Sequence, residues 1–413
     1  MSTTTTAPLF SADYYQNPFP TLAELRAHDP VHEFRFPVGE VRAWLITRYD
    51  DARALLADPR LSPEGRTWGN EDFVEAGLVA GQGSVLERAV TVVDPPDHTR
   101  LRKLGMRPFT PANARRWAER IREVTRQQIE ACATQGHFDV MADLAGPVSS
   151  RVMGEILGLR LDRHADLVAA LEQAFPSCSD DAGDAAVGFA AICAYAEELV
   201  AEKRSAPAED LVTSLLTVAN DGDRLSSEEV VAMVAAMILA GSDTVRAFLG
   251  NAVHALLGSR KQWDVIVDQP RAGHDTEDPA ARAVEELLRY EGALSSALFR
   301  LATEDLVVRG RTIRRGEPVV VSLAAANRDP EVFDRPDELD LRRSGAAHLG
   351  LGHGIHNCMG SGLARLEGRI VLREVLQAFP ALELRDPQAP AQYVENWAMR
   401  RLTSLPVVTG RED

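Results

Sequence analysis

The apolar segment Val230 to Ala240, with the sequence VVAMVAAMILA, restricts the possible folds more than any other feature of this chain. A helix start precedes it: the Ser226 hydroxyl can cap the amide of Glu229, and the Glu229 carboxylate can reach back. The next strong helix stop is Gly258. Residues 227–257 therefore predict one helix of about 46 Å at 1.5 Å per residue. Its first half is apolar on all sides, so we expect this helix to run through the core.

The rest of the chain reads as mainly helical, with small sheets contributed by both ends. Most of the sequence between Asp50 and Glu291 has helical periodicity, and no stretch has the composition of an interdomain linker. We therefore expect one domain that spans residues 1–413. The clearest predicted helices cover residues 113–132 and 188–204, a hairpin is predicted over 31–48, and strands are predicted over 298–303, 305–312, 317–322 and 403–408.

The middle of the predicted central helix holds four poor helix formers, Gly241 to Thr244. An acid and a hydroxyl inside an apolar element need partners or neutralisation. One interpretation is a helix that kinks or ends here and exposes Asp243 to solvent. The other is a local opening that presents the Thr244 hydroxyl and the Asp243 carboxylate to a buried site. The residues alone leave both open.

The segment Leu351 to Gly360, LGHGIHNCMG, is the most informative for chemistry. Its three glycines let the backbone approach a bulky partner closely. Cys358 precedes a helical pattern, and a helix N-terminus favours a thiolate. A zinc site from His353, His356 and Cys358 lacks a fourth ligand nearby. A cysteine nucleophile remains possible, but apolar neighbours and the glycine frame suit a large planar ligand better.

These residues resemble the cytochrome P450 family of haem-thiolate monooxygenases. Residues 351–360 match the family's cysteine motif except that Leu351 replaces the usual phenylalanine, a change that concerns packing and redox tuning near the sulfur. The residues Ala240 to Thr244 resemble its oxygen-activation motif. The pair Glu286 and Arg289 resembles its Glu-x-x-Arg motif, 42 residues after Thr244 and 69 before Cys358. The resemblance covers nearly the whole chain.

The resemblance implies a role for each matched residue. It implies that Cys358 is the axial ligand of the haem iron and that Asp243 and Thr244 are catalytic residues that deliver protons. It also implies that Glu286, Arg289 and Arg343 form a structural charge cluster. The implied fold is a triangular helical prism, with haem b (iron protoporphyrin IX) between the central helix and the helix after the cysteine.

Four basic residues match the family's contacts to the haem propionates: His98, Arg102, Arg300 and His356. His98 and Arg102 form an i,i+4 pair, so they share one helix face. Any one of them alone reads more simply as a surface charge. Together, and with the resemblance, they are expected to bind the cofactor.

The implied reaction consumes two electrons and two protons to cleave O₂. One oxygen atom enters a C–H bond or a double bond of the substrate, and the other leaves as water. The chain shows no flavin or nicotinamide domain, so the electrons are expected from a separate ferredoxin-type or flavodoxin-type partner. A basic dock for it would comprise Arg107, Arg115, Arg116, Arg365 and Arg369, although these are equally consistent with scattered surface arginines.

The substrate is expected to be a medium or large hydrophobic molecule, with natural-product tailoring as the setting. Two alternatives stay open. One is a haem-thiolate enzyme with peroxide-driven, coupling or isomerising chemistry, and the other is a helical binding protein without haem. In the family, the pocket walls are the segment before Asp94 and residues 175–189, 236–240, 295–298 and 397–399.

Composition excludes several other classes. The formal net charge of −16 argues against nucleic-acid binding, which depends on basic residues. The longest apolar run is far shorter than the roughly 20 residues that span a bilayer. The N-terminus lacks a secretory pattern, and four cysteines without regular spacing predict no disulfide framework. We therefore expect a cytoplasmic protein without a membrane partner.

Overall fold

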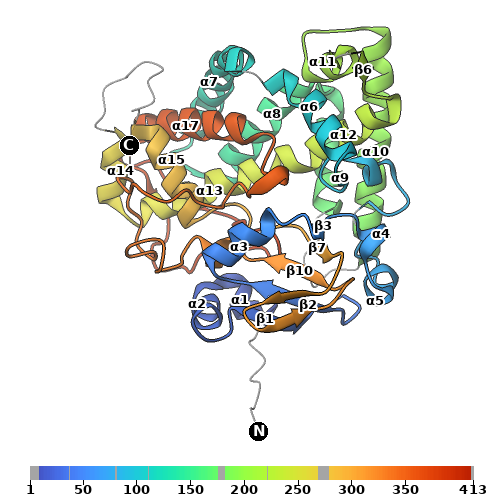
Figure 1. Ribbon diagram of the computed structural model, residues 1–413. Coiled ribbons are helices and arrows are strands. Elements are labelled where there is room, and N and C mark those ends of the chain that lie inside the picture. Colours follow the sequence, from blue (N-terminus) through green and yellow to red (C-terminus); the bar gives the residue numbers. More distant parts are fainter. Residues whose placement is uncertain are drawn as a thin grey trace.

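The computed structural model describes residues 9–36, 38–79, 81–109, 111–174, 182–220, 222–267 and 279–410. As expected, this part of the chain is mainly helical with small sheets. In Figure 1 the largest sheet lies at one end beside α1 and α2, and the helices form the rest of the molecule. The N-terminal part of the chain therefore belongs to the sheet end.

The helices between Asp50 and Glu291 that the periodicity predicts are present, with longer bounds at 111–133 and 182–205. The α-helices are α1 (Ala12–Gln16), α2 (Phe19–His28), α3 (Tyr49–Leu56), α4 (Gly65–Trp68), α5 (Glu71–Glu75), α6 (Asp97–Gly105), α7 (Pro111–Ala133), α8 (Gly146–Leu157), α9 (His164–Ala174), α10 (Ala182–Ser205), α11 (Leu211–Thr217), α12 (Ser227–Gly241), α13 (Asp243–Leu257), α14 (Arg260–Val267), α15 (Pro279–Tyr290), α16 (Leu323–Ala326) and α17 (Ser361–Ala378).

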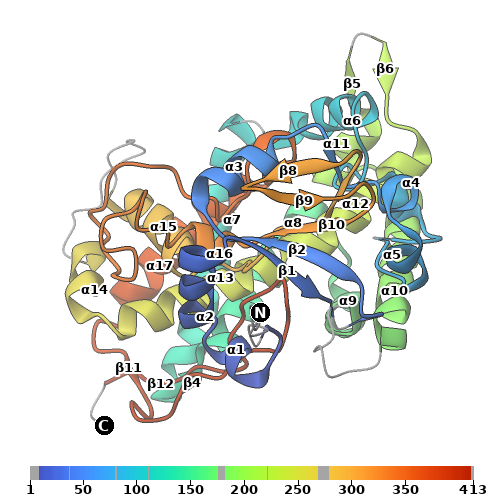
Figure 2. The ribbon, with the colours of Figure 1, turned by 60° about the horizontal axis from the view of Figure 1, so that its bottom comes forward.

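The strands form one sheet of order β1-β2-β10-β7-β3, a second of order β11-β12-β4, and the hairpins β5-β6 and β8-β9. Both main sheets join segments that are distant in sequence, and Figure 2 shows β11, β12 and β4 together near the C-terminus. The strands are β1 (Val31–Arg35), β2 (Arg42–Ile46), β3 (Leu61–Ser62), β4 (His137–Asp139), β5 (Ala219–Asn220), β6 (Asp223–Arg224), β7 (Arg300–Ala302), β8 (Leu306–Val308), β9 (Arg311–Ile313), β10 (Pro318–Val321), β11 (Glu383–Leu384) and β12 (Pro406–Val408).

The predicted N-terminal hairpin is confirmed: β1 pairs antiparallel with β2, with Val31 opposite Ile46. Strand β10 then pairs in parallel with β2 and antiparallel with β7. Burial is complete along β10, as expected for a strand inside a sheet that is covered on both faces. The sheet therefore holds β7, and with it Arg300, in a fixed place beside the helices.

The prediction of one continuous helix over 227–257 is wrong in detail, because the helix is interrupted at Ser242. Ser226 and Glu229 form the expected capping box at the start of α12, and α13 ends at Gly258. Ser242 both ends α12 and precedes α13 without a side-chain cap. The interruption therefore lies at the start of the polar residues that broke the apolar pattern.

Gly241 has a packing reason beside this interruption. A Cβ atom there would lie 2.2 Å from the Met153 Cε atom on α8, which is closer than real contacts allow. Glycine therefore lets α8 approach the central helix closely at the point where the helix breaks.

Within the described residues, one segment is long and apolar enough to cross a membrane by length and composition, Ser227–Leu257. These are α12 and α13, and 56% of the apolar window is buried inside the protein. The segment thus runs through the core, as the apolar pattern predicts.

Candidate active site

The loop before α17 presents Cys358 on a tightly held backbone. The Cys358 amide donates to the Leu351 carbonyl at 2.9 Å, and Gly352 and Gly354 have positive φ angles of 74°. A Cβ atom on Gly354 would lie 2.5 Å from the Leu56 carbonyl oxygen at the end of α3. The glycines are therefore needed both for the turn and for close packing against α3.

The Cys358 thiol has two arginines near it that favour its charged form. Its side chain is exposed on one side. Burial is the largest influence and leaves the pKa of the thiol raised, although a Gly360 amide and the charges of Arg102 and Arg365 lower it. Burial also raises the pKa of Cys132, to about 11, and the charge of Asp143 raises it further. Cys358 is thus better placed than Cys132 to be a thiolate.

Helix α6 and the centre of α12 meet the cysteine loop through small or flexible residues. A Cβ atom on Gly105, at the end of α6, would lie 2.6 Å from the Met233 sulfur on α12 and 3.1 Å from the Met359 Cε atom. Arg102, one turn earlier on α6, donates to the Asn357 carbonyl at 2.8 Å and to its side-chain oxygen at 2.7 Å. The three segments therefore form one site.

The basic residues expected to bind a cofactor lie together beside this loop. The His98 and His356 rings are 4.3 Å apart between centroids. Both ring nitrogens of His98 and the Nε2 atom of His356 are buried without a hydrogen-bond partner. Arg300 is 7% exposed and bonds the Phe299 carbonyl at 3.1 Å. The structure brings the predicted set together.

This cluster carries more positive charge than the protein neutralises. Burial lowers the pKa of Arg300 to about 10, and the carboxylate of Asp94 opposes it. Burial, followed by the charges of Arg300, His98 and Arg102, lowers the pKa of His356 to about 3. A group with two negative charges would relieve both effects.

Large apolar side chains are exposed beside the same cluster. Ile355 of the cysteine loop is 48% exposed and Leu298, just before β7, is 51% exposed. Exposed large apolar residues next to a buried guanidinium and buried ring nitrogens without partners suit a ligand with an apolar plane and two acidic groups. Haem, with its porphyrin plane and two propionates, fits these donors. No cluster of three or more metal-ligating side chains occurs in the described parts of the chain.

Asp243 lies at the helix interruption, paired with arginines and largely buried. Its carboxylate is 3.3 Å from the Arg401 Nε atom and 3.9 Å from an Arg246 nitrogen, and its side chain is 15% exposed. The Thr244 hydroxyl donates to the Ala240 carbonyl at 2.6 Å. The helix thus breaks here, as the first interpretation expects, but Asp243 is paired with arginines and not freely exposed.

Glu286, Arg289 and Arg343 form a closely bonded cluster. Arg289 donates two hydrogen bonds to the Glu286 carboxylate, at 2.7 and 2.8 Å, and Arg343 donates to both of its oxygens at 3.1 Å. The two side chains of the first pair are only 2% and 3% exposed. Arg289 also bonds the carbonyls of Asn327 and Pro336. Almost every donor and acceptor in this cluster has a partner.

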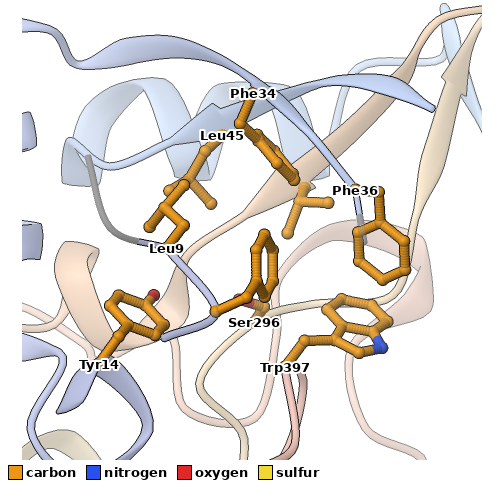
Figure 3. Close-up of a pocket in the computed structure, with 9 residues that line it drawn as sticks. Leu9, Tyr14, Phe34, Phe36, Leu45, Ser296 and Trp397 are labelled. Atoms are coloured by element: carbon orange, nitrogen blue, oxygen red, sulfur yellow. The ribbon is translucent and has the colours of Figure 1, made fainter. Parts of the chain in front are cut away.

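Parts of the expected pocket wall are also near one another. Ser296 and Trp397 line one small pocket together with Phe36 and Tyr14 (Figure 3). Ala240, within the buried helix α12, is exposed, so this face of the helix is open. Of the predicted wall over 175–189, residues 175–181 and with them Cys178 lie outside the described residues.

The arginines of the expected basic dock are less available than the sequence suggests. Arg365 donates to Glu285 at 2.6 Å, and Arg116 pairs with Glu209 at 2.9 Å. Arg107 donates to the Ala219 carbonyl at 2.8 Å. Arg115 is exposed. The face near the cysteine is therefore partly neutralised by its own carboxylates.

Sequence reasoning missed two features of the site. Glu367, on α17 nine residues after the cysteine, is 1% exposed, and burial raises its pKa to about 8. Its position on one face of a long helix was visible, but nothing in the sequence indicated that its Oε1 atom would have no hydrogen-bond partner among the described residues. Arg401 is the second, because only the fold brings the C-terminal tail to Asp243.

Comparison with known proteins agrees with this site. The family model described as Cytochrome P450 matches residues 280–401. The chain is 38% identical to a vitamin D(3) 25-hydroxylase of Pseudonocardia autotrophica, over 97% of this chain and 96% of that protein. It is 38% identical to the cytochrome P450 monooxygenase PikC of Streptomyces venezuelae, over 96% and 92%.

A solved structure shows the same fold. The cytochrome P450 PksS of the Bacillus subtilis bacillaene polyketide synthase superimposes with a TM-score of 0.88 at 30% identity, covering 97% of this chain and 99% of that one. The likeness extends over nearly the full length of both chains. The protein therefore belongs to the cytochrome P450 family and is one of its haem-dependent monooxygenases.

Proposed function

We propose that this monooxygenase hydroxylates or epoxidises a medium or large hydrophobic natural product, with haem b as its cofactor. The observation that carries the proposal is the glycine-framed loop of Cys358 beside the buried Arg300 guanidinium, the unpartnered ring nitrogens of His98 and His356, and exposed apolar side chains. A single domain over residues 1–413 would contain the whole site. The relatives' names, a hydroxylase and a monooxygenase, favour this over haem-thiolate chemistry without oxygen insertion and over a binding protein without haem.

Cys358 is proposed as the axial thiolate ligand. When bound, the haem supplies the activation of O₂. The protein's own part is to hold the sulfur in place and to favour the thiolate. The hydrogen bond from the Cys358 amide to the Leu351 carbonyl holds the loop, and Gly360, Arg102 and Arg365 favour the negative charge on the sulfur. The two propionates would be held by the basic residues beside this loop: His98, Arg102, Arg300 and His356.

Asp243 and Thr244 are proposed to manage protons. The Thr244 hydroxyl is held by the Ala240 carbonyl, at the break between α12 and α13, where a water can be oriented. The Asp243 carboxylate lies one residue before it and is close enough to solvent, at 15% exposed, to reload a proton. Glu286, Arg289 and Arg343 would have a structural role, since they face one another and the backbone.

The electron donor is proposed to be a separate ferredoxin-type or flavodoxin-type protein. Arg115 is exposed and remains a candidate for its dock, whereas Arg369 is half-buried and has an interaction of its own. The paired Arg116 and Arg365 would contribute less, because their charges are already compensated. Soluble, cytoplasmic placement is part of the same proposal, since a soluble donor must reach this face.

The substrate class is proposed from relatives and from the wall residues together. The names of two relatives mention vitamin D(3) and the bacillaene polyketide synthase. Both names point to large apolar molecules. The open face of α12 is lined by small residues such as Ala236 and Ala240, which leave room for such a substrate. Natural-product tailoring fits both the relatives' names and the small wall residues.

The test begins with the reduced, carbon-monoxide-bound protein, which should show the strongly red-shifted Soret band of thiolate ligation. Cys358→Ala should lose the band, while Cys132→Ala and Cys193→Ala, as matched controls, should keep it. Macrolide, linear polyketide and secosteroid panels are then supplied with a surrogate ferredoxin system and NADPH. Products that gain one oxygen atom from ¹⁸O₂ support the proposal. Full turnover with hydrogen peroxide alone, or loss of the band only in a control variant, would contradict it.

A further inference from the structure

The C-terminal tail from Tyr393 to Leu402 is attached to helix α13 at two points. The Asn251 side chain, which is fully buried, donates to the Arg400 carbonyl at 2.8 Å. Two turns earlier, the Asp243 carboxylate pairs with the next tail residue, Arg401, at 3.3 Å. The tail and the helix that begins at Asp243 are thus joined side by side.

The same tail is also attached to the segment that precedes β7. The Ser295 amide donates to the Ala398 carbonyl at 2.7 Å, and the Arg400 amide donates to the Ala293 carbonyl at 2.8 Å. The buried Arg400 guanidinium adds an ion pair with Glu291 at 2.8 Å. These contacts join the C-terminal tail to the segment before β7, and the two segments form one wall of the proposed substrate pocket.

Trp397 shows that this tail faces a pocket. Its indole ring lies beside Phe36, and Ser296 faces the same space (Figure 3). Trp397 and Arg401 are four residues apart on one short, bonded segment. The segment therefore joins a pocket-lining residue to Arg401.

Two arginines face Asp243, and they differ in their attachments. Arg246 is on the same helix, 3.9 Å away, and the charges of Glu172 and Asp139 also act on it. Arg401 is nearer, at 3.3 Å, and comes from the tail. Both have side chains that are no more than 20% exposed, so solvent screens these pairs less than surface pairs. Arg401 is thus the cation that links Asp243 to the pocket wall.

We propose that Arg401 is a positioning residue for Asp243, which holds the carboxylate against the tail so that proton delivery depends on the placement of the substrate-facing wall. The proposal rests on the proposed role of Asp243 in proton delivery. Arg401 itself contacts neither substrate nor haem in this scheme. Its effect on turnover must therefore pass through Asp243.

A double-mutant cycle on the holoenzyme tests this, with the NADPH consumption rate and product yield measured for Arg401→Gln, Asp243→Asn and the double variant. Arg401→Gln should lower kcat roughly threefold to tenfold, a range typical of two side chains in contact, with substrate Kd nearly unchanged. In the Asp243→Asn background the same substitution should have no further effect. Arg401→Lys, which keeps the charge, should recover most of kcat. Arg385→Gln, at an exposed arginine that follows β11, is the control and should change nothing.

The outcomes separate this proposal from the one on which it rests. If Arg401→Gln slows turnover equally in the wild-type and in the Asp243→Asn background, Arg401 acts on the fold and the inference is wrong. An unchanged kcat in Arg401→Gln overturns it as well. If Asp243→Asn itself turns over normally, the proposed role of Asp243 fails instead. Should Arg401→Gln not fold, Arg401→Met keeps the side-chain stem and carries the same cycle under the same criteria.

Discussion

Two buried charge clusters of this protein differ in how completely they are paired. In the cluster around Glu286, the carboxylate accepts from Arg289, Arg343 and the Asp340 amide, and the spare arginine nitrogens bond backbone carbonyls. In the cluster beside Cys358, both ring nitrogens of His98 and the Nε2 atom of His356 are buried without a hydrogen-bond partner. The first cluster is electrostatically complete within the protein, and the second is not.

The difference separates a structural role from a binding role. A paired cluster loses stability when any member is removed, because the remaining charge stays buried. A cluster of like charges is stabilised only by what binds to it, so it lowers the stability of the protein alone and increases the affinity for an anion. Substitutions in the two clusters should therefore have opposite effects on the protein without haem.

The largest expected effect is that of breaking the complete cluster. Glu286→Ala leaves Arg289 and Arg343 buried with uncompensated charge, which typically costs about 3–5 kcal/mol. We expect little soluble protein, and a strongly reduced urea midpoint for what can be purified.

Asp166→Ala is the matched control. Asp166 pairs with Arg163 at 2.8 Å and the same i,i+3 spacing, but its side chain is 68% exposed. The control should change stability by less than about 1 kcal/mol. Equal effects of the two substitutions would mean that the Glu286 cluster is no more than a surface pair.

The second largest effect concerns a buried carboxyl, Glu367, for which the described contacts show no charged partner. Burial raises the pKa of its carboxyl from 4.5 to about 8. The folded protein thus keeps it protonated where the unfolded chain ionises it, so its stabilising contribution is complete below pH 4.5 and is lost as the pH rises towards 8. By pH 7 the loss amounts to about 3 kcal/mol.

Glu367→Gln cannot ionise and should remove this pH dependence. Urea midpoints between pH 5 and 8 should fall less with pH in the variant than in the wild type, so that the variant gains relative stability at pH 8. Glu383→Gln, at an exposed position of β11, should leave the pH dependence as it is. Parallel curves for Glu367→Gln and the wild type would show that Glu367 has a charged partner.

The third prediction concerns the incomplete cluster, where a substitution should not lower the stability of the protein without haem. Arg300→Leu removes a buried cation whose pKa burial already lowers to about 10, so the protein without haem should be as stable as the wild type or more so. Haem loses a charge-assisted hydrogen bond worth about 1.5–3 kcal/mol, and its loss to apomyoglobin should be roughly ten to a hundred times faster.

Arg289→Leu, measured in the same way, sharpens the contrast. Here the protein without haem should be strongly destabilised, because Glu286 keeps only one of its two arginines. Were Arg300→Leu to destabilise the protein without haem as much as Arg289→Leu, the cluster beside Cys358 would be structural too.

The sequence predicted those parts of the site that depend on neighbours along the chain. The glycine positions around Cys358 and the capping box at Ser226 are both local consequences of residue type. The alternation in residues 31–48 likewise predicted the hairpin β1-β2 without knowledge of the fold.

The remainder depended on which segments the fold brings together. The partner of Asp243, Arg401, lies in the C-terminal tail, far away along the chain. Arg365 appeared to be a free surface cation, but α15 places Glu285 opposite it. A partner for Glu367 could equally have been expected and is not found among the described contacts. Long-range charge pairing has no periodicity that a sequence can show.

The smallest effect on stability should come from Thr244→Ala, and it is also the most specific for function. The Thr244 hydroxyl makes one hydrogen bond, across the break to the Ala240 carbonyl of α12, and its loss should cost about 1 kcal/mol or less. Substrate affinity should be nearly unchanged, because the proposed task of Thr244 is to orient a water and not the substrate. Proton delivery should instead fail, so that reducing equivalents are consumed with less product and more H₂O₂. Thr244→Ser keeps the hydroxyl and should stay largely coupled. The measurement is product and H₂O₂ formed per NADPH, beside the urea midpoint of each variant. A fully coupled Thr244→Ala would mean that the break between α12 and α13 serves packing against Met153 alone, and that protons reach the site through the substrate's own hydroxyl or another side chain.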